Sequence, residues 1–340
     1  MKKGFIIKTV KIISFLLVMA VLLEVLSFTV FSKYAAGTAY RNKMNKTYSF
    51  YTEPAETIQV VGVGNSDLYS GFVPTKLFED YGYTCQLTGS PYQTPLLSYY
   101  YLKEMFKTQT PEVVMIEVDM LYDENPGVQV PEETKLDSLF NYADTDDFQA
   151  VIANQFAVFT FHDRWKKLNL GKQDLRTPNS HGYKYFTSVG KANLKDYMKK
   201  TDVAEQPHKN RLHQFDMLYN LCIDEGAKVF FVEMPTTNSW NYARHNAAVS
   251  IAKEYGVEFI DLNLRTDELG LNLKKEFRDK GNHLNYKGAC KVTKYLGDYI
   301  KNNYNLEDRR TNPDYKFWHD SVKAFKKEMK AEDKRREEED

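Results

Sequence analysis

A continuous apolar run lies close to the N-terminus, from Ile12 to Phe31. The only residues in this run of 20 that are not apolar are Ser14, Glu24, Ser27 and Thr29. About 20 residues of α-helix cross the hydrocarbon core of a bilayer, which is about 30 Å thick. The run therefore predicts a membrane-spanning helix within a first segment, residues 1–33.

The charges around the run predict its orientation. No acidic residue occurs before Glu24, and the basic residues in front of the run are Lys2, Lys3, Lys8 and Lys11. Because positively charged flanks stay in the cytoplasm, we expect a cytoplasmic N-terminus and an extracellular C-terminal domain. Ala35-Ala36-Gly37 offers a small-residue cleavage site, so a cleaved signal peptide is the alternative. The run is longer than the usual apolar core of a signal peptide, which favours an uncleaved single-pass anchor in the cell membrane.

Beyond a polar, tyrosine-rich linker, residues 34–57, apolar β-branched runs alternate with helical patterns. The expected strands are residues 58–64, 83–87, 113–118, 229–233 and 257–261. The expected helices are residues 73–81, 95–107, 212–225, 241–255 and 286–302. Such alternation is typical of a parallel sheet that helices cover on both faces. We therefore expect a flavodoxin-like, three-layer α/β/α domain with a mainly parallel five-stranded sheet over residues 58–305.

Two further segments depart from this pattern. An insertion at about residues 120–205 is too long for a simple crossover and is expected to form a helical cap or side lobe. Within it, Arg164 is a candidate for binding an anionic substrate group, and a plain amphipathic helix is the alternative. Residues 306–340 predict a charged C-terminal helix with a narrow apolar stripe that docks partly on the body. A docking helix for a membrane or wall partner is the alternative there.

Composition excludes several classes of function. The chain has 46 basic and 46 acidic residues, and this neutral balance argues against a nucleic-acid partner. Its three cysteines lie far apart, so neither a zinc knuckle nor a disulfide scaffold is expected. The remaining histidines show no metal-ligand spacing with acids or cysteines, and we expect neither a metal nor another cofactor.

Two polar segments carry candidate chemistry. Gly64-Asn65-Ser66 follows the first expected strand, and a serine at such a turn presents its hydroxyl at the carboxyl edge of the sheet. Small polar residues are also ordinary helix caps, so this segment by itself leaves a capping role open. Asp279 and His283 precede the last helix of the body and would supply a base with its orienting acid. Local packing or capping by His283 is the alternative.

Together, the two segments resemble the SGNH/GDSL hydrolase superfamily over roughly residues 58–300. In that family the nucleophilic serine follows the first strand, and a late segment supplies the acid and the histidine. The resemblance implies that Ser66 is the nucleophile, that His283 is the base, and that Ser66 and Gly89 provide oxyanion donors. With the membrane anchor, the chain looks most like the surface-facing branch of the superfamily. That branch includes the D-alanyl-lipoteichoic acid biosynthesis protein and alginate-acetylation-type proteins.

The sequence departs from the family in two places. The family acid lies three residues before the histidine, where this chain has Lys280, so Asp279, four residues before, is the candidate acid. The family's third block, Gly-x-Asn-Asp, is replaced by Ile-Glu-Val-Asp-Met at residues 116–120, which offers no asparagine donor. Loss of one oxyanion donor typically costs about 2.7–4 kcal/mol of transition-state stabilisation. A specialised acyl transfer and a degenerate, non-catalytic relative therefore both stay open.

The expected function is extracytoplasmic, serine-dependent acyl transfer or ester hydrolysis, with an O-acyl or D-alanyl group. The expected partners are a cell-surface polysaccharide or teichoic-acid-like polymer and a membrane acyltransferase. Asn65 and Trp240 are further candidates for substrate binding, Trp240 as a platform for a sugar; a packed tryptophan is the alternative. An esterase that deacylates carbohydrate is one rival function. A non-catalytic scaffold or glycan-binding protein of the cell envelope is the other.

Overall fold

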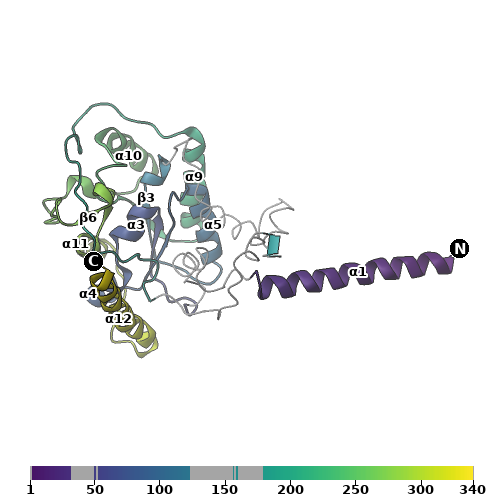
Figure 1. The fold of residues 1–340 in the computed structure, drawn as a ribbon. Helices are drawn as coiled ribbons and strands as arrows, with labels where there is room; N and C mark the ends of the chain where they lie inside the picture. The colour runs from purple at the N-terminus through teal and green to yellow at the C-terminus, as the bar shows by residue number, and fades with distance from the viewer. Residues whose placement is uncertain are drawn as a thin grey trace. The chain divides into compact units, whose positions relative to one another are not determined.

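The computed structural model describes residues 2–31, 50, 53–122, 156, 158–159 and 179–339 (Figure 1). The chain divides into two compact units, residues 1–43 with 135–176 and residues 44–134 with 177–340. Most of the expected linker, and the part of the insertion that contains Arg164, lie outside the described residues.

The first unit contains helix α1 (Lys2–Phe28). From Gly4 to Phe28 this helix is long and apolar enough to cross a membrane, by length and composition. Its 25 residues span about 37 Å at the rise of an α-helix. The Thr9 and Thr29 hydroxyls donate to backbone carbonyls one turn earlier, so they need no water as a partner. A signal sequence near the N-terminus passes the same test of length and composition.

The second unit is built around a five-stranded parallel sheet in the order β2-β1-β3-β4-β5. Its strands are β1 (Val60–Gly64), β2 (Cys85–Gly89), β3 (Val113–Glu117), β4 (Lys228–Glu233) and β5 (Phe259–Asp261). Strands β1 and β3 are buried along their whole length, which explains their continuous apolar runs. All five expected strands are confirmed. Strand β2 lies two residues later than predicted, because Thr88 and Gly89 continue its pairing with β1.

Helices cover both faces of this sheet. They are α3 (Ser66–Gly71), α4 (Pro74–Tyr81), α5 (Pro95–Met105), α9 (Lys209–Asp224), α10 (Tyr242–Tyr255) and α11 (Tyr286–Asn303). Helix α11 packs on α3 and α4, whereas α5 packs on α9. In β4, the Phe230 ring contacts Tyr299 of α11, and the next ring, Phe231, contacts Phe215 of α9. Successive side chains of a strand point to opposite faces, so the expected three-layer arrangement is confirmed.

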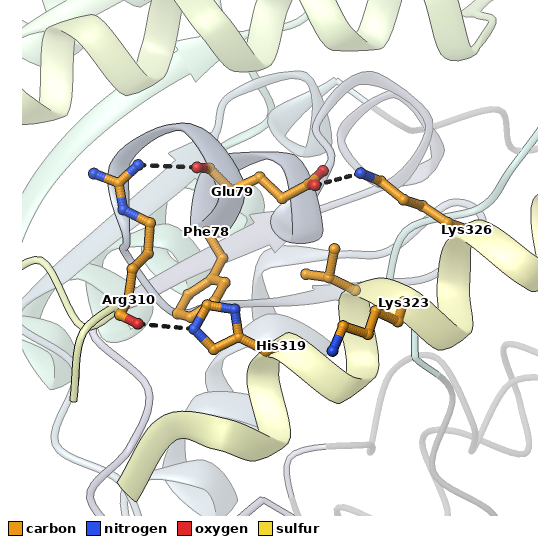
Figure 2. Close-up of a pocket in the computed structure, with 7 residues that line it drawn as sticks. Phe78, Glu79, Arg310, His319, Lys323 and Lys326 are labelled. Carbon is orange, nitrogen blue, oxygen red and sulfur yellow. Dashed lines mark hydrogen bonds and ion pairs between the residues drawn. The ribbon is translucent and has the colours of Figure 1, made fainter. Parts of the chain in front are cut away.

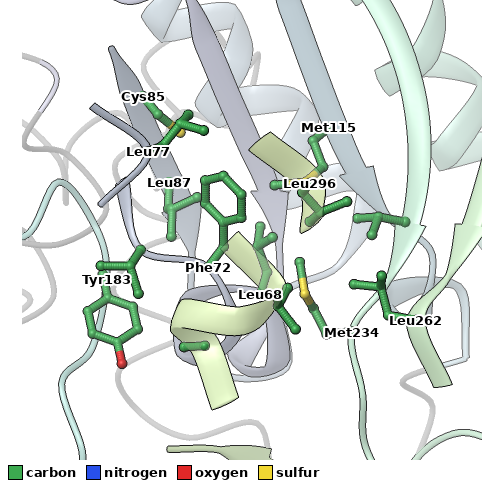
Figure 3. Packing of buried hydrophobic residues seen from close by; sticks show 14 of the residues in the cluster. Leu68, Phe72, Leu77, Cys85, Leu87, Met115, Tyr183, Met234, Leu262 and Leu296 are labelled. Carbon is green, nitrogen blue, oxygen red and sulfur yellow. The ribbon is translucent and has the colours of Figure 1, made fainter. Parts of the chain in front are cut away.

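One apolar cluster fills the face of the sheet under α3, α4 and α11 (Figure 3). Fully buried members that meet there are Leu68, Phe72, Leu77, Leu87, Met115 and Leu296. Two of them, Leu68 in α3 and Phe72 directly after it, anchor this short helix in the core. The first turn of α3 is therefore held on a close-packed support.

The charged C-terminal segment forms helix α12 (Lys316–Glu339). Trp318 and Val322 pack with Phe78 of α4, and Phe325 joins the main core. The apolar stripe of this helix therefore packs on the body.

A segment under α12, residues 179–186, is called the edge segment here because it follows the edge strand β2. The Leu87 N–H donates to the His181 carbonyl at 2.9 Å. From α12, the Asp333 carboxylate accepts the Tyr185 hydroxyl at 2.8 and 2.9 Å. The edge segment therefore lies between the sheet edge and the C-terminal helix.

Candidate functional site

The carboxyl end of β1 leads directly into the turn that carries Ser66. Asn65 is the N-cap of α3, and its side-chain oxygen accepts the Asp67 N–H at 2.9 Å. Asn65 and Asp67 are buried, whereas Ser66 between them is partly exposed. The turn therefore presents Ser66, rather than its neighbours, at the carboxyl edge of the sheet.

His283 is presented by a small antiparallel hairpin, β6 (Phe277–Arg278) and β7 (His283–Leu284). Of the four residues between these strands, the first three, 279–281, have positive φ angles of 51°, 59° and 98°. Only the last is glycine, so two ordinary residues occupy the left-handed region, which the surrounding structure must hold in place. This turn folds Asp279 back beneath the imidazole although it lies four residues earlier.

The contact between Asp279 and His283 has hydrogen-bond length. Asp279 Oδ2 lies 3.0 Å from His283 Nδ1. A carboxylate in this position orients the imidazole and stabilises its protonated form. Arg278 also contacts the Asp279 carboxylate and donates to the Ser70 hydroxyl at 2.8 Å. Arg278 therefore ties the hairpin to α3, and the sequence offers no signal for this link.

The other ring nitrogen of His283 faces the start of α3. His283 Nε2 lies 3.8 Å from Asp67 Oδ1, one residue beyond Ser66. Among the residues that the structure describes, the Ser66 hydroxyl makes no hydrogen bond with His283. In enzymes without substrate the bond between nucleophile and base is often long and shortens in the complex. The structure thus brings the two segments together and leaves their hydrogen bond unmade.

The surroundings of His283 keep its imidazole neutral. Burial lowers its pKa from 6.5 to about 4, and the positive charge of Arg278 acts in the same direction. The hydrogen bond to Asp279 opposes this shift, and Lys184 adds to it. The imidazole is therefore unprotonated at pH 7, the state in which it can accept a proton from serine.

Gly89, the expected second oxyanion donor, lies against the turn of Ser66. It ends β2 and pairs with Gly64, the last residue of β1. A Cβ at Gly89 would lie 3.1 Å from the Asn65 carbonyl oxygen and 3.2 Å from the Tyr69 ring. The two backbone segments expected to stabilise an oxyanion are therefore neighbours.

The residues expected to bind substrate are placed differently. Trp240 is 3% exposed, its indole N–H donates to Asp261 at 2.9 Å, and its ring packs edge-on against Tyr122. A sugar platform needs an accessible ring face, so the structure corrects this prediction in favour of a packed tryptophan. Asn65 is also buried, and its side chain contacts the protein rather than an open surface.

A second histidine lies between a carboxylate and a serine. His181 Nε2 is 2.8 Å from the Ser321 hydroxyl, and Nδ1 is 3.0 Å from Glu53 Oε1. Its ring stacks on Trp318 with 3.7 Å between centroids. His181 is 2% exposed, and Glu53 and Ser321 are each 9% exposed. These four residues, named the His181 lock, are too deeply buried to receive a substrate in this structure.

A hollow of about 370 Å³ lies between α4 and α12 (Figure 2). It is lined by Phe78, Glu79, Arg310, His319, Val322, Lys323 and Lys326. Figure 2 shows Lys326 paired with Glu79, and His319 bonded to the Arg310 carbonyl. This lining contains no serine or cysteine nucleophile, so the hollow is no rival to the edge of the sheet for acyl chemistry.

No family model and no curated protein sequence matches the chain. Among solved structures, it is similar to a GDSL-like lipase from Bacteroides thetaiotaomicron, at 12% identity over 77% of this chain and 98% of that chain, with a TM-score of 0.38. It is also similar to a Bacteroides fragilis protein described as an acylhydrolase, at 12% identity, 75% and 94% coverage and a TM-score of 0.36. A Desulfitobacterium hafniense protein described as lipolytic and of the G-D-S-L family matches at 11% identity, 71% and 98% coverage and a TM-score of 0.33. These scores are too low to transfer an activity, so a function for this chain has to rest on its own site.

Proposed function

We propose that this chain is a serine-dependent esterase or O-acyltransferase with Ser66 as its nucleophile. The observation that carries the proposal is the 3.0 Å contact between Asp279 and His283. His283 begins β7, and β7 packs against α3, the helix that begins with Ser66. A neutral imidazole with an orienting acid and a partly exposed serine meet at the carboxyl edge of a parallel sheet. This combination suits nucleophilic acyl transfer.

In the proposed reaction, His283 accepts the Ser66 hydroxyl proton as the Ser66 oxygen attacks an ester carbonyl. Asp279 stabilises the imidazolium, and the N–H groups of Ser66 and Gly89 stabilise the oxyanion. His283 then returns the proton to the departing alcohol as the ester bond breaks, which leaves an acyl-serine. Water or a glycan or polyol hydroxyl attacks this intermediate, giving the free acid or an acylated acceptor and restoring the serine. These steps need no cofactor.

We further propose that the reaction takes place outside the cell membrane. The support is α1, which is long and apolar enough to span it, together with the lysines in front of its apolar run. The proposed acyl group is an O-acyl or D-alanyl group. Its acceptor or donor is a cell-surface polysaccharide or teichoic-acid-like polymer, and a membrane acyltransferase is the proposed partner. Protease added to wall-free cells should digest residues 44–340; full protection of this unit would contradict the orientation.

The assignment of Ser66 is tested by a fluorophosphonate probe, which forms a phosphonyl-serine with loss of fluoride. The full chain in detergent should be labelled at Ser66, and Ser66→Ala should abolish labelling. Ser321→Ala is the matched control, because it removes the hydroxyl that contacts His181 and should leave labelling unchanged. Equal labelling of wild type and Ser66→Ala would overturn the assignment.

A non-catalytic scaffold or glycan-binding protein that keeps the same fold is the second candidate. It is favoured by His283 Nε2 facing Asp67 at 3.8 Å and by the missing bond to the Ser66 hydroxyl among the described residues. In that case neither wild type nor Ser66→Ala reacts with the probe. Both would then bind isolated cell-wall polymer equally well in a sedimentation assay.

A further inference from the structure

Asn65, the residue before the proposed nucleophile, is held from three directions. Its backbone N–H donates to Glu117 Oε2 at 2.6 Å, and its side-chain amide donates to Asp119 Oδ2 at 2.9 Å. Its side-chain oxygen accepts the Asp67 N–H at 2.9 Å. Asn65, Glu117 and Asp119 are 3%, 0% and 1% exposed. Water therefore does not compete for these contacts. Because Asn65 is held in place, the backbone that enters Ser66 is held as well.

Acids are well suited to hold this asparagine in one orientation. The amide nitrogen of Asn65 donates to the Asp119 carboxyl oxygen, and its amide oxygen accepts the backbone N–H of Asp67, so each end of the amide has its own partner. A neutral hydroxyl or amide at residue 119 would allow the Asn65 side chain to flip, which would remove the cap on α3.

The approach of Glu117 depends on the neighbouring strand. Glu117 ends β3 beside β1, where Val63 pairs with Ile116. A Cβ at Gly64 would lie 2.6 Å from the Glu117 Cβ, so only glycine leaves room for this side chain. Gly64 is therefore needed for the contact between Glu117 and the Asn65 N–H.

Asp119 has its own support. It begins a short 3-10 turn after β3, Asp119–Leu121, and its Oδ1 lies 3.7 Å from Arg244 Nη1. The Arg244 guanidinium lies 4.7 Å from the Tyr122 ring and pairs with Glu205 at 3.0 Å. Arg244 thus places a positive charge beside the buried acid and offsets part of the cost of burying it.

We propose that Glu117 and Asp119 are positioning residues that fix Asn65 and thereby orient Ser66 for attack, without touching the substrate. The catalytic part of this inference rests on the proposed function. Residues 116–120, which carry no asparagine, then support the backbone before the nucleophile and donate no hydrogen bond to the oxyanion.

A reciprocal exchange of side chains tests the pair of Asn65 and Asp119. Asn65→Asp keeps an oxygen to cap α3 but sets two carboxylates against each other, so the rate of fluorophosphonate labelling should fall by roughly tenfold or more. The double variant with Asp119→Asn restores a donor and an acceptor with their roles reversed. Its labelling rate should return to within about threefold of wild type, the range expected for a restored pair.

Glu233→Gln is the matched control. Glu233 ends β4, is fully buried, and its carboxyl oxygens have no hydrogen-bond partner among the described residues. Burial and the neighbouring acids raise the pKa of Glu233 well above its usual value, which favours its uncharged form. Glutamine has nearly the same size as this uncharged form, and labelling should not change.

Hydrogen exchange in the peptide spanning residues 60–72 of the full chain provides a readout that needs no activity. Exchange should be faster in Asn65→Asp and should return to the wild-type rate in the double variant. If wild type is never labelled, the proposed function fails, and this exchange pattern still decides the positioning role. Wild-type labelling and exchange in Asn65→Asp, or no recovery in the double variant, would overturn the inference.

A second variant covers the case in which Asn65→Asp does not fold. Gly64→Ala displaces Glu117 and should slow labelling and speed exchange over residues 60–72. Wild-type behaviour of Gly64→Ala in both measurements would overturn the role of Glu117.

Discussion

His283 and His181 each have a carboxylate oxygen 3.0 Å from Nδ1, yet their surroundings differ. The His181 ring meets Ser321 through its other nitrogen, stacks on Trp318 and is 2% exposed. The His283 side chain is 13% exposed, and its Nε2 faces Asp67 across 3.8 Å. The more complete serine–histidine contact is thus the one that no substrate can reach.

This difference shows that solvent access separates a structural from a reactive arrangement of serine, histidine and acid. In the His181 lock, the chain itself supplies a neighbour to each ring nitrogen of His181, Ser321 on one side and Glu53 on the other. A site that binds a reactant must leave part of its hydrogen-bonding capacity for that reactant. The partly exposed Ser66 and the Nε2 of His283 meet this requirement at the edge of the sheet.

Removing each imidazole in turn should give the largest difference between the catalytic role of His283 and the structural role of His181. His283→Ala should lower the labelling rate about 10²–10⁴-fold, because the general base is lost. His181→Ala should leave the labelling rate of folded protein unchanged and lower the free energy of unfolding instead. Labelling kinetics and urea unfolding of both variants check this. Slow labelling of His181→Ala together with a wild-type labelling rate in His283→Ala would contradict the assigned roles.

The ring under His181 gives the largest expected change in stability. Trp318→Ala removes a fully buried side chain, and such a change costs about 3–5 kcal/mol of unfolding free energy. Lys323→Ala, an exposed change on the same helix, should stay within about 0.5 kcal/mol of wild type. Chemical denaturation measures both variants, and equal stabilities would show that the lock does not hold α12.

The two acids provide a smaller contrast. Asp279→Asn should slow labelling by about one to two orders of magnitude, because the amide cannot stabilise the imidazolium. The Asp279 side chain is 50% exposed, so solvent weakens its effect relative to that of a fully buried acid. Glu53→Gln, next to His181, should leave labelling unchanged. Slow labelling of Glu53→Gln together with a wild-type labelling rate in Asp279→Asn would contradict the assignment of Asp279 as the orienting acid.

The smallest expected effect is on the pH profile. The labelling rate should rise through about pH 4 and then level off, because below its pKa of about 4 His283 is protonated and cannot accept a proton. Arg278→Met removes a positive charge that lowers this pKa, so the acid limb should move to higher pH, toward the ordinary value of about 6.5. Arg310→Met, at the hollow between α4 and α12, is the control that should not move it. An unshifted limb in Arg278→Met would contradict the proposed control of His283.

The sheet and the meeting of the two polar segments could be predicted because they follow from simple physical rules. Parallel strands buried on both faces need apolar residues along most of their length, and these runs are visible in the sequence. The carboxyl ends of such strands share one edge, so a serine directly after β1 had to lie there. The contact between Asp279 and His283 also follows from local spacing, because a short turn can bring together residues four apart.

Other features depend on contacts that spacing does not encode. The turn at Asp279 and Lys280 uses left-handed backbone at two ordinary residues, for which there is no sequence signal. The contact of Glu117 with Asn65 requires the register of β1 and β3. An aromatic residue after a strand looks the same whether it is exposed or, like Trp240, buried.

The edge segment has a consequence for how molecules of this protein meet one another. Strand β2 lies at one end of the sheet order, and the free N–H and C=O groups of an edge strand are a template for pairing with another chain. Here the His181 carbonyl accepts the Leu87 N–H, while the His181 lock pins this covering segment beneath α12. Loss of the charged C-terminal helix would expose the edge of β2. Two such molecules could then pair through their β2 strands and form one continuous sheet.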